Sequence, residues 1–269
     1  MKTDTHTLYP ATHHATFNVV IVHGMQEHAA RYHEFATFLS QHGGNVIVFD
    51  LPGHGASGHD PKQLGNFGSE GLDSVHASIA QHFQRFDNTL PNVLFGHSMG
   101  SFITRDFISK YGEELTGATI CGTTGIFRGA KEVGEKLKEV IDAGHGEESN
   151  PEFAGELMGW MCERCGEVSI GNEWICADPY VQRDHAEDPF DAFTRPTSNR
   201  SIYDFIQMME QIEGTKWADK VPIDLPIYNI AGDQDPVGEY GVGVYQVSNW
   251  LIQTGHTVTT KLYSGYRHE

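Results

Sequence analysis

The chain has 269 residues, of which 39% are hydrophobic, 11% aromatic and 20% charged, so it can bury a sizeable core and is neither disordered nor low-complexity. Acidic residues outnumber basic residues 36 to 18, and the formal charge of −18 would repel nucleic-acid phosphates and anionic bilayers. We therefore expect no nucleic-acid partner. At about 100–200 residues per domain, the length fits one large α/β domain or two small ones.

The apolar runs of the sequence are short. The longest, at residues 19–22 and 46–49, fall far below the ~20 residues that a membrane-spanning helix needs, so we expect no stable membrane insertion. The first four residues lack the apolar core of a signal peptide, which predicts a cytoplasmic protein.

The first 125 residues alternate short β-rich runs with helical patterns, which is typical of βαβ units and a mostly parallel sheet. We predict strands at residues 17–22, 45–50, 92–95 and 118–122. We predict the intervening helices at residues 31–41, 72–86 and 99–111. Because the strands are continuously apolar, helices should cover both faces of the sheet.

The pattern changes after residue 125. The next hundred residues hold no convincing strand but several helical segments, one of which places Val133, Leu137 and Ile141 on one face. Strand-like segments return at residues 226–231 and 257–263. We therefore predict an α/β core of residues 1–125 and 223–269, interrupted by a helical cap of residues 126–222.

A G-x-S-x-G pentapeptide at residues 96–100 carries the clearest chemical signal. It follows an expected strand and opens an expected helix, and this context is typical of the nucleophile elbow, in which a serine lies on a strained turn. Gly96 and Gly100 would relieve crowding on either side of the serine. We therefore predict Ser98 as a nucleophile, with a plain strand–helix turn as the alternative.

A serine nucleophile needs a base and an acid that orients the base. In an open parallel sheet, functional groups gather at the carboxyl ends of the strands. This rule favours His268, just beyond the last expected strand, over His256, which precedes that strand. It also selects the turn after residues 226–231, where Asp233 and Asp235 offer two carboxylates. The resulting order of serine, aspartate and histidine is that of α/β-hydrolases.

Five motifs in this order resemble the monoacylglycerol lipase and lysophospholipase branch of the α/β-hydrolase family. They are H-G-M-Q-E-H at 23–28, D-L-P-G-H-G-A-S-G at 50–58, G-H-S-M-G at 96–100, A-G-D-Q-D at 231–235 and G-Y-R-H-E at 265–269. N-E-W at 172–174 and D-P at 188–189 are similar to the cap of that branch. The resemblance covers nearly the whole chain and implies a mostly parallel central sheet, helices on both faces and a helical cap insertion.

The resemblance also implies roles for individual residues. The acid of the family follows its glycine in the pattern G-x-x-D, which selects Asp235, so the implied catalytic triad is Ser98, Asp235 and His268. The backbone N–H groups of Met25 and Met99 would form the oxyanion hole. No metal or organic cofactor is implied.

Residues 53–58 also fit G-x-G-x-x-G, a pattern typical of dinucleotide binding. That site needs a helix to begin at the glycines, where it holds the pyrophosphate. Here Pro61, Gly65 and Gly68 follow instead, so we expect no nucleotide.

Two sets of potential metal ligands have simpler interpretations. The first set is His23, Glu27, His28 and His33. Its spacing is not that of a metalloprotease, and we interpret it as polar residues at the edge of the sheet, with Glu27 and Arg31 as anchors of their loop. The second set is Cys162, Cys165, Cys176 and His185. Only one of its two pairs is tight, which favours reduced, packed thiols over a zinc site.

These features predict a serine carboxylic-ester hydrolase that acts through an acyl-enzyme on a monoacylglycerol-like or other small acyl or aryl ester. A lysophospholipase, a thioesterase, a peptidase and a non-catalytic ligand-binding protein remain as alternatives. The cap supplies apolar side chains that could line a pocket or pack on the core. They are Phe127, Leu157, Met158, Trp160, Met161, Phe193, Phe205, Met208 and Met209. The related family continues into a closing helix, so we expect a further segment after Glu269; the oligomeric state is not predicted.

Overall fold

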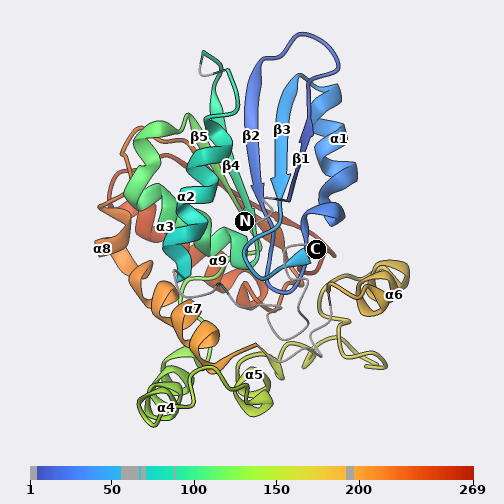
Figure 1. Cartoon of the computed structure of the whole chain (residues 1–269), viewed down its shortest axis with the longest axis vertical. Helices are drawn as coiled ribbons and strands as arrows, with labels where there is room; N and C mark the ends of the chain where they lie inside the picture. Colours follow the sequence, from blue (N-terminus) through green and yellow to red (C-terminus); the bar gives the residue numbers. More distant parts are fainter. Residues whose placement is uncertain (1–4, 56–66, 68–70, 88, 192–196) are drawn as a thin grey trace.

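A seven-stranded sheet forms the centre of the computed structural model, which describes residues 5–55, 67, 71–87, 89–191 and 197–269. The strand order is β1-β3-β2-β4-β5-β6-β7; β2 to β7 are parallel, and β1 pairs antiparallel with β3 at one edge (Figure 1). The strands are β1 (His6–Tyr9), β2 (Phe17–Val22), β3 (Gly44–Phe49), β4 (Asn92–His97), β5 (Gly117–Cys121), β6 (Ile227–Gly232) and β7 (Val258–Tyr263).

Side chains of β2 alternate between two layers of helices, because successive residues of a strand point to opposite faces. Val20 and Val22 belong to a cluster that includes residues of α2 (Gly71–Phe83), α3 (Met99–Tyr111) and α9 (Val242–Gln253). Val19 and Ile21 pack on the other face with Ala36 of α1 (His33–Gln41). The parallel sheet with helices on both faces confirms the predicted fold class.

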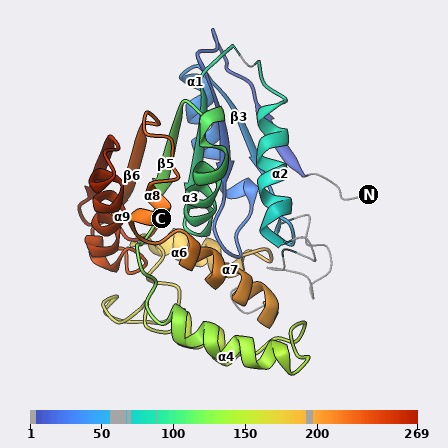
Figure 2. The same cartoon turned by 90° about the vertical axis from the view of Figure 1, so that its left-hand side faces the viewer.

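The described residues include five helices between β5 and β6. They are α4 (Ala130–Asp142), α5 (Pro151–Met158), α6 (Pro179–Glu187), α7 (Asn199–Gln211) and α8 (Gly214–Ala218). The views show α4, α5 and α6 beyond the carboxyl ends of the parallel strands (Figures 1 and 2). These helices have local start signals: Asn150 and Asp178 cap α5 and α6 from their side chains, and a proline follows each cap.

The structure differs from the sequence prediction in several elements, among them α9, for which no helix was predicted between the last two strands. β1 was not predicted, because four residues with no apolar alternation give little signal for an edge strand. A 3-10 turn at Ala29–Tyr32 precedes α1, so the helix expected from residue 31 begins at His33. α2 ends at Phe83 rather than residue 86.

Some predictions fall on residues outside the described segments. These are part of the D-L-P-G-H-G-A-S-G motif, at Ala56, Ser57 and Gly58, together with Pro61, Gly65, Gly68 and Phe193. Across the segments that are described, no helix is both long and apolar enough to span a bilayer.

Candidate active site

Ser98 lies on a strained turn between the end of β4 and the start of α3. Its backbone has φ 53° and ψ −123°, a combination with positive φ that a residue with a side chain adopts only under constraint. A Cβ on Gly96 would overlap the carbonyl group of Gly100, and a Cβ on Gly100 would overlap the carbonyl oxygen of Val22. The two glycines therefore allow this turn to pack directly against its neighbours.

Asp235 and His268 form a buried hydrogen-bonded pair at the same end of the sheet. Asp235 follows β6; its Oδ1 accepts from the Val237 N–H at 2.9 Å, and its Oδ2 lies 2.9 Å from His268 Nδ1. His268 follows β7, and its ring packs 5.2 Å from the ring of Trp174, between centroids. An ionised carboxylate can only accept, so Nδ1 carries the proton and Nε2 is left as the proton acceptor.

The structure brings Asp235, and not Asp233, to His268. Asp233 is half-buried, and its Oδ1 accepts from the Gly265 N–H at 2.8 Å, a hydrogen bond that lowers the pKa of this carboxyl. Asp233 therefore fixes the turn on which His268 lies. His256 is buried before β7, with Nε2 3.0 Å from the carbonyl oxygen of Val221.

Ser98 and His268 line one small cavity of about 40 Å³, together with Gly24 and Met25. His268 Nε2 is buried and has no hydrogen-bond partner among the described residues. A Cβ on Gly24 would lie 2.9 Å from Ser98 Cβ, so the loop after β2 passes close to the serine. Met25 on this loop and Met99 on α3 both border the serine, and within the described segments neither backbone N–H donates to a protein acceptor.

A buried ion pair between Glu27 and His97 supports this loop; Glu27 was predicted as an anchor of the loop, whereas its partner His97 was not. Glu27 Oε1 accepts from the Gly24 N–H, from the Tyr32 hydroxyl at 2.8 Å and from His97 Nδ1 at 3.1 Å. The other ring nitrogen, Nε2 of His97, lies 3.1 Å from the carbonyl oxygen of His268. A doubly protonated His97 therefore donates both to the loop beside Ser98 and to the backbone of His268.

Charge decides the protonation of this pair. Burial opposes the charged form of His97, but the hydrogen bond and negative charge of Glu27 outweigh it and raise the pKa of His97 to about 9. Burial likewise opposes ionisation of Glu27, yet His97, His23 and Arg31 hold its pKa well below the ordinary range. The pair is therefore a carboxylate and an imidazolium at neutral pH.

Arg31 joins the cap to the end of the chain that carries His268. Its guanidinium lies 2.7 Å from Asp191 Oδ2, 2.6 Å from Glu269 Oε1 and 3.5 Å from Glu27 Oε2. Only 8% of the Arg31 side chain is exposed, so these ion pairs are poorly screened. Segments that are far apart in sequence therefore meet at one cation beside the active site.

A largely apolar cavity of about 500 Å³ opens from Ser98 under the cap. Of the apolar cap residues that the sequence singled out, six line it: Phe127, Leu157, Met158, Met161, Phe205 and Met209. Met208 and Trp160 do not line the cavity; Met208 belongs to the hydrophobic core and Trp160 packs against it. Gln26 and Thr197 add polar atoms to the cavity and hydrogen-bond to each other at 2.9 Å.

The fold does not bring all the members of either set of potential metal ligands together at one point. His23 is buried and accepts from the Leu51 N–H at 3.0 Å, whereas His33 contacts the Tyr9 hydroxyl at 3.1 Å. All four cysteines have free thiols. Among the described residues, the one group with metal-ligand geometry contains none of these cysteines.

The fold and this site define a class of protein. A serine on a strained strand–helix turn, a buried aspartate–histidine pair after two later strands, and a parallel sheet with helices on both faces together define the α/β-hydrolases. Ser98, Asp235 and His268 occur in the chain order of that class.

Comparison with known proteins identifies the family. A model of the family described as serine aminopeptidase, S33, matches residues 13–269, so the chain belongs to this family. A thermostable carboxyl esterase from Bacillus coagulans, solved in complex with glycerol, is 45% identical with a TM-score of 0.91; the match covers 98% of this chain and 86% of that one. The predicted α/β-hydrolase, serine-hydrolase family is confirmed.

Curated relatives match over shorter stretches. A monoacylglycerol lipase of Mycolicibacterium smegmatis is 33% identical over 107 residues, which cover 39% of this chain and 36% of that protein. A phospholipase of Bacillus subtilis is 33% identical over 92 residues, which cover 34% of each chain. The matched stretches thus span about a third of these relatives, and they confirm the resemblance to the monoacylglycerol lipase and lysophospholipase branch.

Proposed function

We propose that the chain is a carboxylic-ester hydrolase with Ser98 as nucleophile, His268 as general base and Asp235 as the acid that orients it. The observation that carries this proposal is the buried Asp235–His268 hydrogen bond, whose free Nε2 lies in the cavity that Ser98 also lines. A serine is a poor nucleophile at its ordinary pKa, so a positioned base is what the chemistry requires.

The reaction then proceeds in two halves. The Ser98 hydroxyl transfers its proton to His268 Nε2 as its oxygen attacks the acyl carbonyl carbon, and the N–H groups of Met25 and Met99 bind the developing oxyanion. His268 returns the proton to the leaving alcohol, which leaves an acyl group on Ser98. A water molecule gives a proton to His268 and attacks the acyl carbon, and return of that proton to Ser98 releases the acid.

The cavity indicates the kind of ester. Its volume of about 500 Å³ and its lining by phenylalanine, leucine and methionine side chains suit the acyl chain of a monoacylglycerol-like ester or a small aryl ester. The net charge of −18 disfavours an anionic lipid surface and favours an ester that arrives from solution. The esterase and monoacylglycerol lipase relatives agree with this class of substrate.

Matched pairs of variants test the proposal. Ser98→Ala should abolish both turnover of nitrophenyl esters and labelling by a fluorophosphonate, whereas Ser109→Ala, on the same helix, should keep both. A Ser98→Ala protein that still turns over esters would refute the nucleophile. A panel of esters from acetyl to palmitoyl places the acyl length, and thioester, lysophospholipid and peptide substrates test the alternatives. Labelling without turnover on the full panel would refute ester hydrolysis but not the nucleophile.

A further inference from the structure

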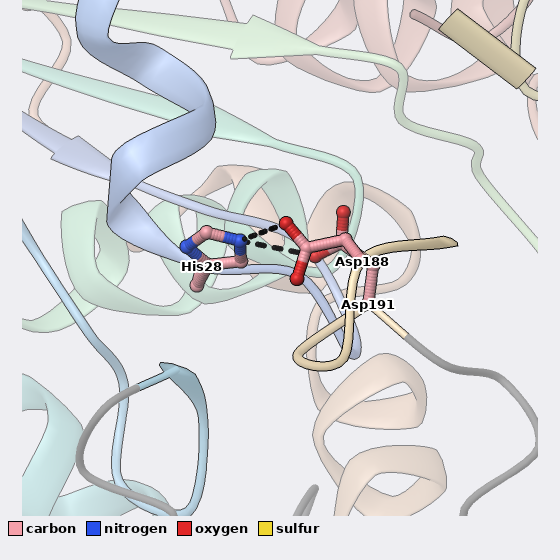
Figure 3. A group of neighbouring side chains, drawn as sticks. All are labelled: His28, Asp188 and Asp191. Carbon is pink, nitrogen blue, oxygen red and sulfur yellow. Dashed lines mark hydrogen bonds and ion pairs between the residues drawn. The ribbon is translucent and has the colours of Figure 1, made fainter. Parts of the chain in front are cut away.

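A second group of side chains, which could bind a metal ion, lies where the cap meets the core. Among the described residues, His28, Asp188 and Asp191 bring one ligand atom each to within 4.8 Å of one another (Figure 3). His28 belongs to the loop after β2, whereas Asp188 and Asp191 follow α6 in the cap, so the group bridges two parts of the chain 160 residues apart. None of the three lines either cavity at Ser98.

The distances within the group fit a tetrahedral metal centre. His28 Nε2 lies 3.0 Å from Asp188 Oδ2 and 3.5 Å from Asp191 Oδ1. Ligands about 2.0–2.1 Å from a tetrahedral zinc ion are separated by about 3.3 Å, which falls between these two distances. One ion could therefore be bound with small movements of the three side chains.

One oxygen of the group lacks a hydrogen-bond partner in the described part of the chain. Asp191 is fully buried, and its Oδ1 has no hydrogen-bond partner among the described residues, although it faces the His28 ring. A buried carboxylate oxygen without a partner is costly, and a bound cation is one of the ways in which proteins satisfy it. This orphaned oxygen separates the group from an ordinary surface ion pair.

The remaining oxygens are already held in place, as they are around established metal ligands. Asp188 Oδ1 accepts from the Phe190 N–H at 2.8 Å, and Asp191 Oδ2 accepts from Arg31 at 2.7 Å. Each carboxylate is thus anchored through one oxygen and presents the other to His28. The ring of His28 packs edge-on against Phe190, with 5.6 Å between centroids, which fixes its direction.

The local charge also favours a cation. The single guanidinium of Arg31 is shared among four carboxylates: those of Glu27, Asp184, Asp191 and Glu269. Asp188 adds a fifth acid next to them. With the His97 imidazolium beside Glu27, two cations face these five acids, so the junction still holds an excess of acidic groups. Burial and the neighbouring acids Asp188 and Glu27 raise the pKa of Asp191 to about 8. A divalent ion would offset this excess.

We propose that His28, Asp188 and Asp191 form a binding site for a divalent transition-metal ion, Zn²⁺ in the first instance, that clamps the cap to the core. A set of one imidazole and two carboxylates is typical of zinc and its neighbours rather than of Ca²⁺ or Mg²⁺, which prefer all-oxygen sites. Since the group lies outside the cavities at Ser98, the ion stabilises the protein and takes no part in ester cleavage.

The experiment uses the full chain, stripped with a chelator and then titrated with Zn²⁺ by calorimetry, with metal content measured after dialysis. The wild-type protein should retain one equivalent of zinc, and its Tm should rise on zinc addition. His28→Gln and Asp188→Asn should each weaken zinc binding at least about tenfold and remove the rise in Tm. His145→Gln removes an exposed histidine that is paired with Glu148 at 2.7 Å and serves as the matched control.

Each outcome decides the proposal independently of catalysis. Fluorophosphonate labelling of Ser98 reports whether each variant folds, and the visible spectrum of Co²⁺ bound in place of zinc reports the ligand set. The site is supported if His28→Gln loses both the single equivalent of bound zinc and the visible absorption bands of bound Co²⁺, while His145→Gln keeps both. The proposal is overturned if the wild-type protein binds no zinc, or if His28→Gln and Asp188→Asn bind zinc as tightly as the wild-type protein does.

Discussion

Replacing Glu27 by glutamine should change how the stability of the protein depends on pH. The folded-state pKa of His97 is raised to about 9, against an ordinary value of 6.5. Because this pKa is raised on folding, protonated His97 contributes to the free energy of unfolding. Its contribution is fully present below pH 6.5 and is lost as the pH rises through about 9. Glu27 stays ionised throughout this window in both states, so it does not contribute to the slope.

The magnitude follows from the size of the shift. The difference between about 9 and 6.5 corresponds to about 3 kcal/mol, because one pKa unit is worth about 1.4 kcal/mol. His97 alone should therefore lower the free energy of unfolding of the wild-type protein by up to about 3 kcal/mol between pH 6.5 and pH 9. In Glu27→Gln the neutral amide no longer favours the imidazolium, and burial then keeps His97 neutral, so the part of the fall that comes from His97 should disappear.

Urea unfolding at pH 6.5, 7.5 and 9 measures the effect directly. Tyr32→Phe is the matched control, because it removes a 2.8 Å hydrogen bond to the same carboxylate oxygen but leaves the charge of Glu27, and so should keep the wild-type slope. His97→Gln removes the titrating group and should behave as Glu27→Gln does. The reasoning is refuted if Glu27→Gln keeps a wild-type dependence on pH while His97→Gln loses it.

Three further predictions concern the site and its turn. Asp235→Asn should lower kcat by roughly 10³–10⁴-fold, because the amide no longer holds the productive His268 tautomer, whereas Asp233→Asn should change kcat little; steady-state kinetics compare the two. Gly100→Ala should prevent folding, because its Cβ would overlap the backbone of β2, but Gly155→Ala, which has open space in α5, should stabilise the protein by about 0.5–1 kcal/mol in thermal unfolding. Leu157→Trp should narrow the larger cavity and lower kcat/KM for palmitoyl esters far more than for acetyl esters; equal losses on both would show that Leu157 does not limit acyl length.

The geometry at Ser98 was the most predictable part of the site because its signals are local. The turn is set by a pentapeptide, and the strand that precedes it and the helix that follows it are short-range patterns. His268 and the turn of Asp233 and Asp235 needed only one further rule, that functional groups collect at the carboxyl ends of parallel strands. That rule could not separate the two aspartates. The structure does so, because only the loop of Asp235 turns inward to His268.

Of the charged support of the site, only the anchoring roles of Glu27 and Arg31 were predicted; the partners were not, because the pairs are far apart in the chain. Glu27 and His97 are separated by 70 residues, His28 and Asp188 by 160, and Arg31 and Glu269 by 238. Each of these residues is common at surfaces, and no periodicity or spacing marks it as buried. Only the tertiary packing, within the core for Glu27–His97 and Arg31–Glu269 and between cap and core for His28–Asp188, brings these ordinary polar residues together.

The pairing of Glu27 with His97 also has a consequence for the chemistry proposed at His268. The rings of His97 and His268 lie 4.8 Å apart between centroids, so a lone histidinium there would oppose the positive charge that the reaction places on His268. Glu27 is hydrogen-bonded to that same ring, and the pair is neutral as a unit. His97 can therefore hold the backbone of His268 with a strong hydrogen bond and still not disfavour the imidazolium. A neutral amide in place of Glu27 would leave His97 uncharged and more weakly bonded to the His268 carbonyl, and the base would be less well placed.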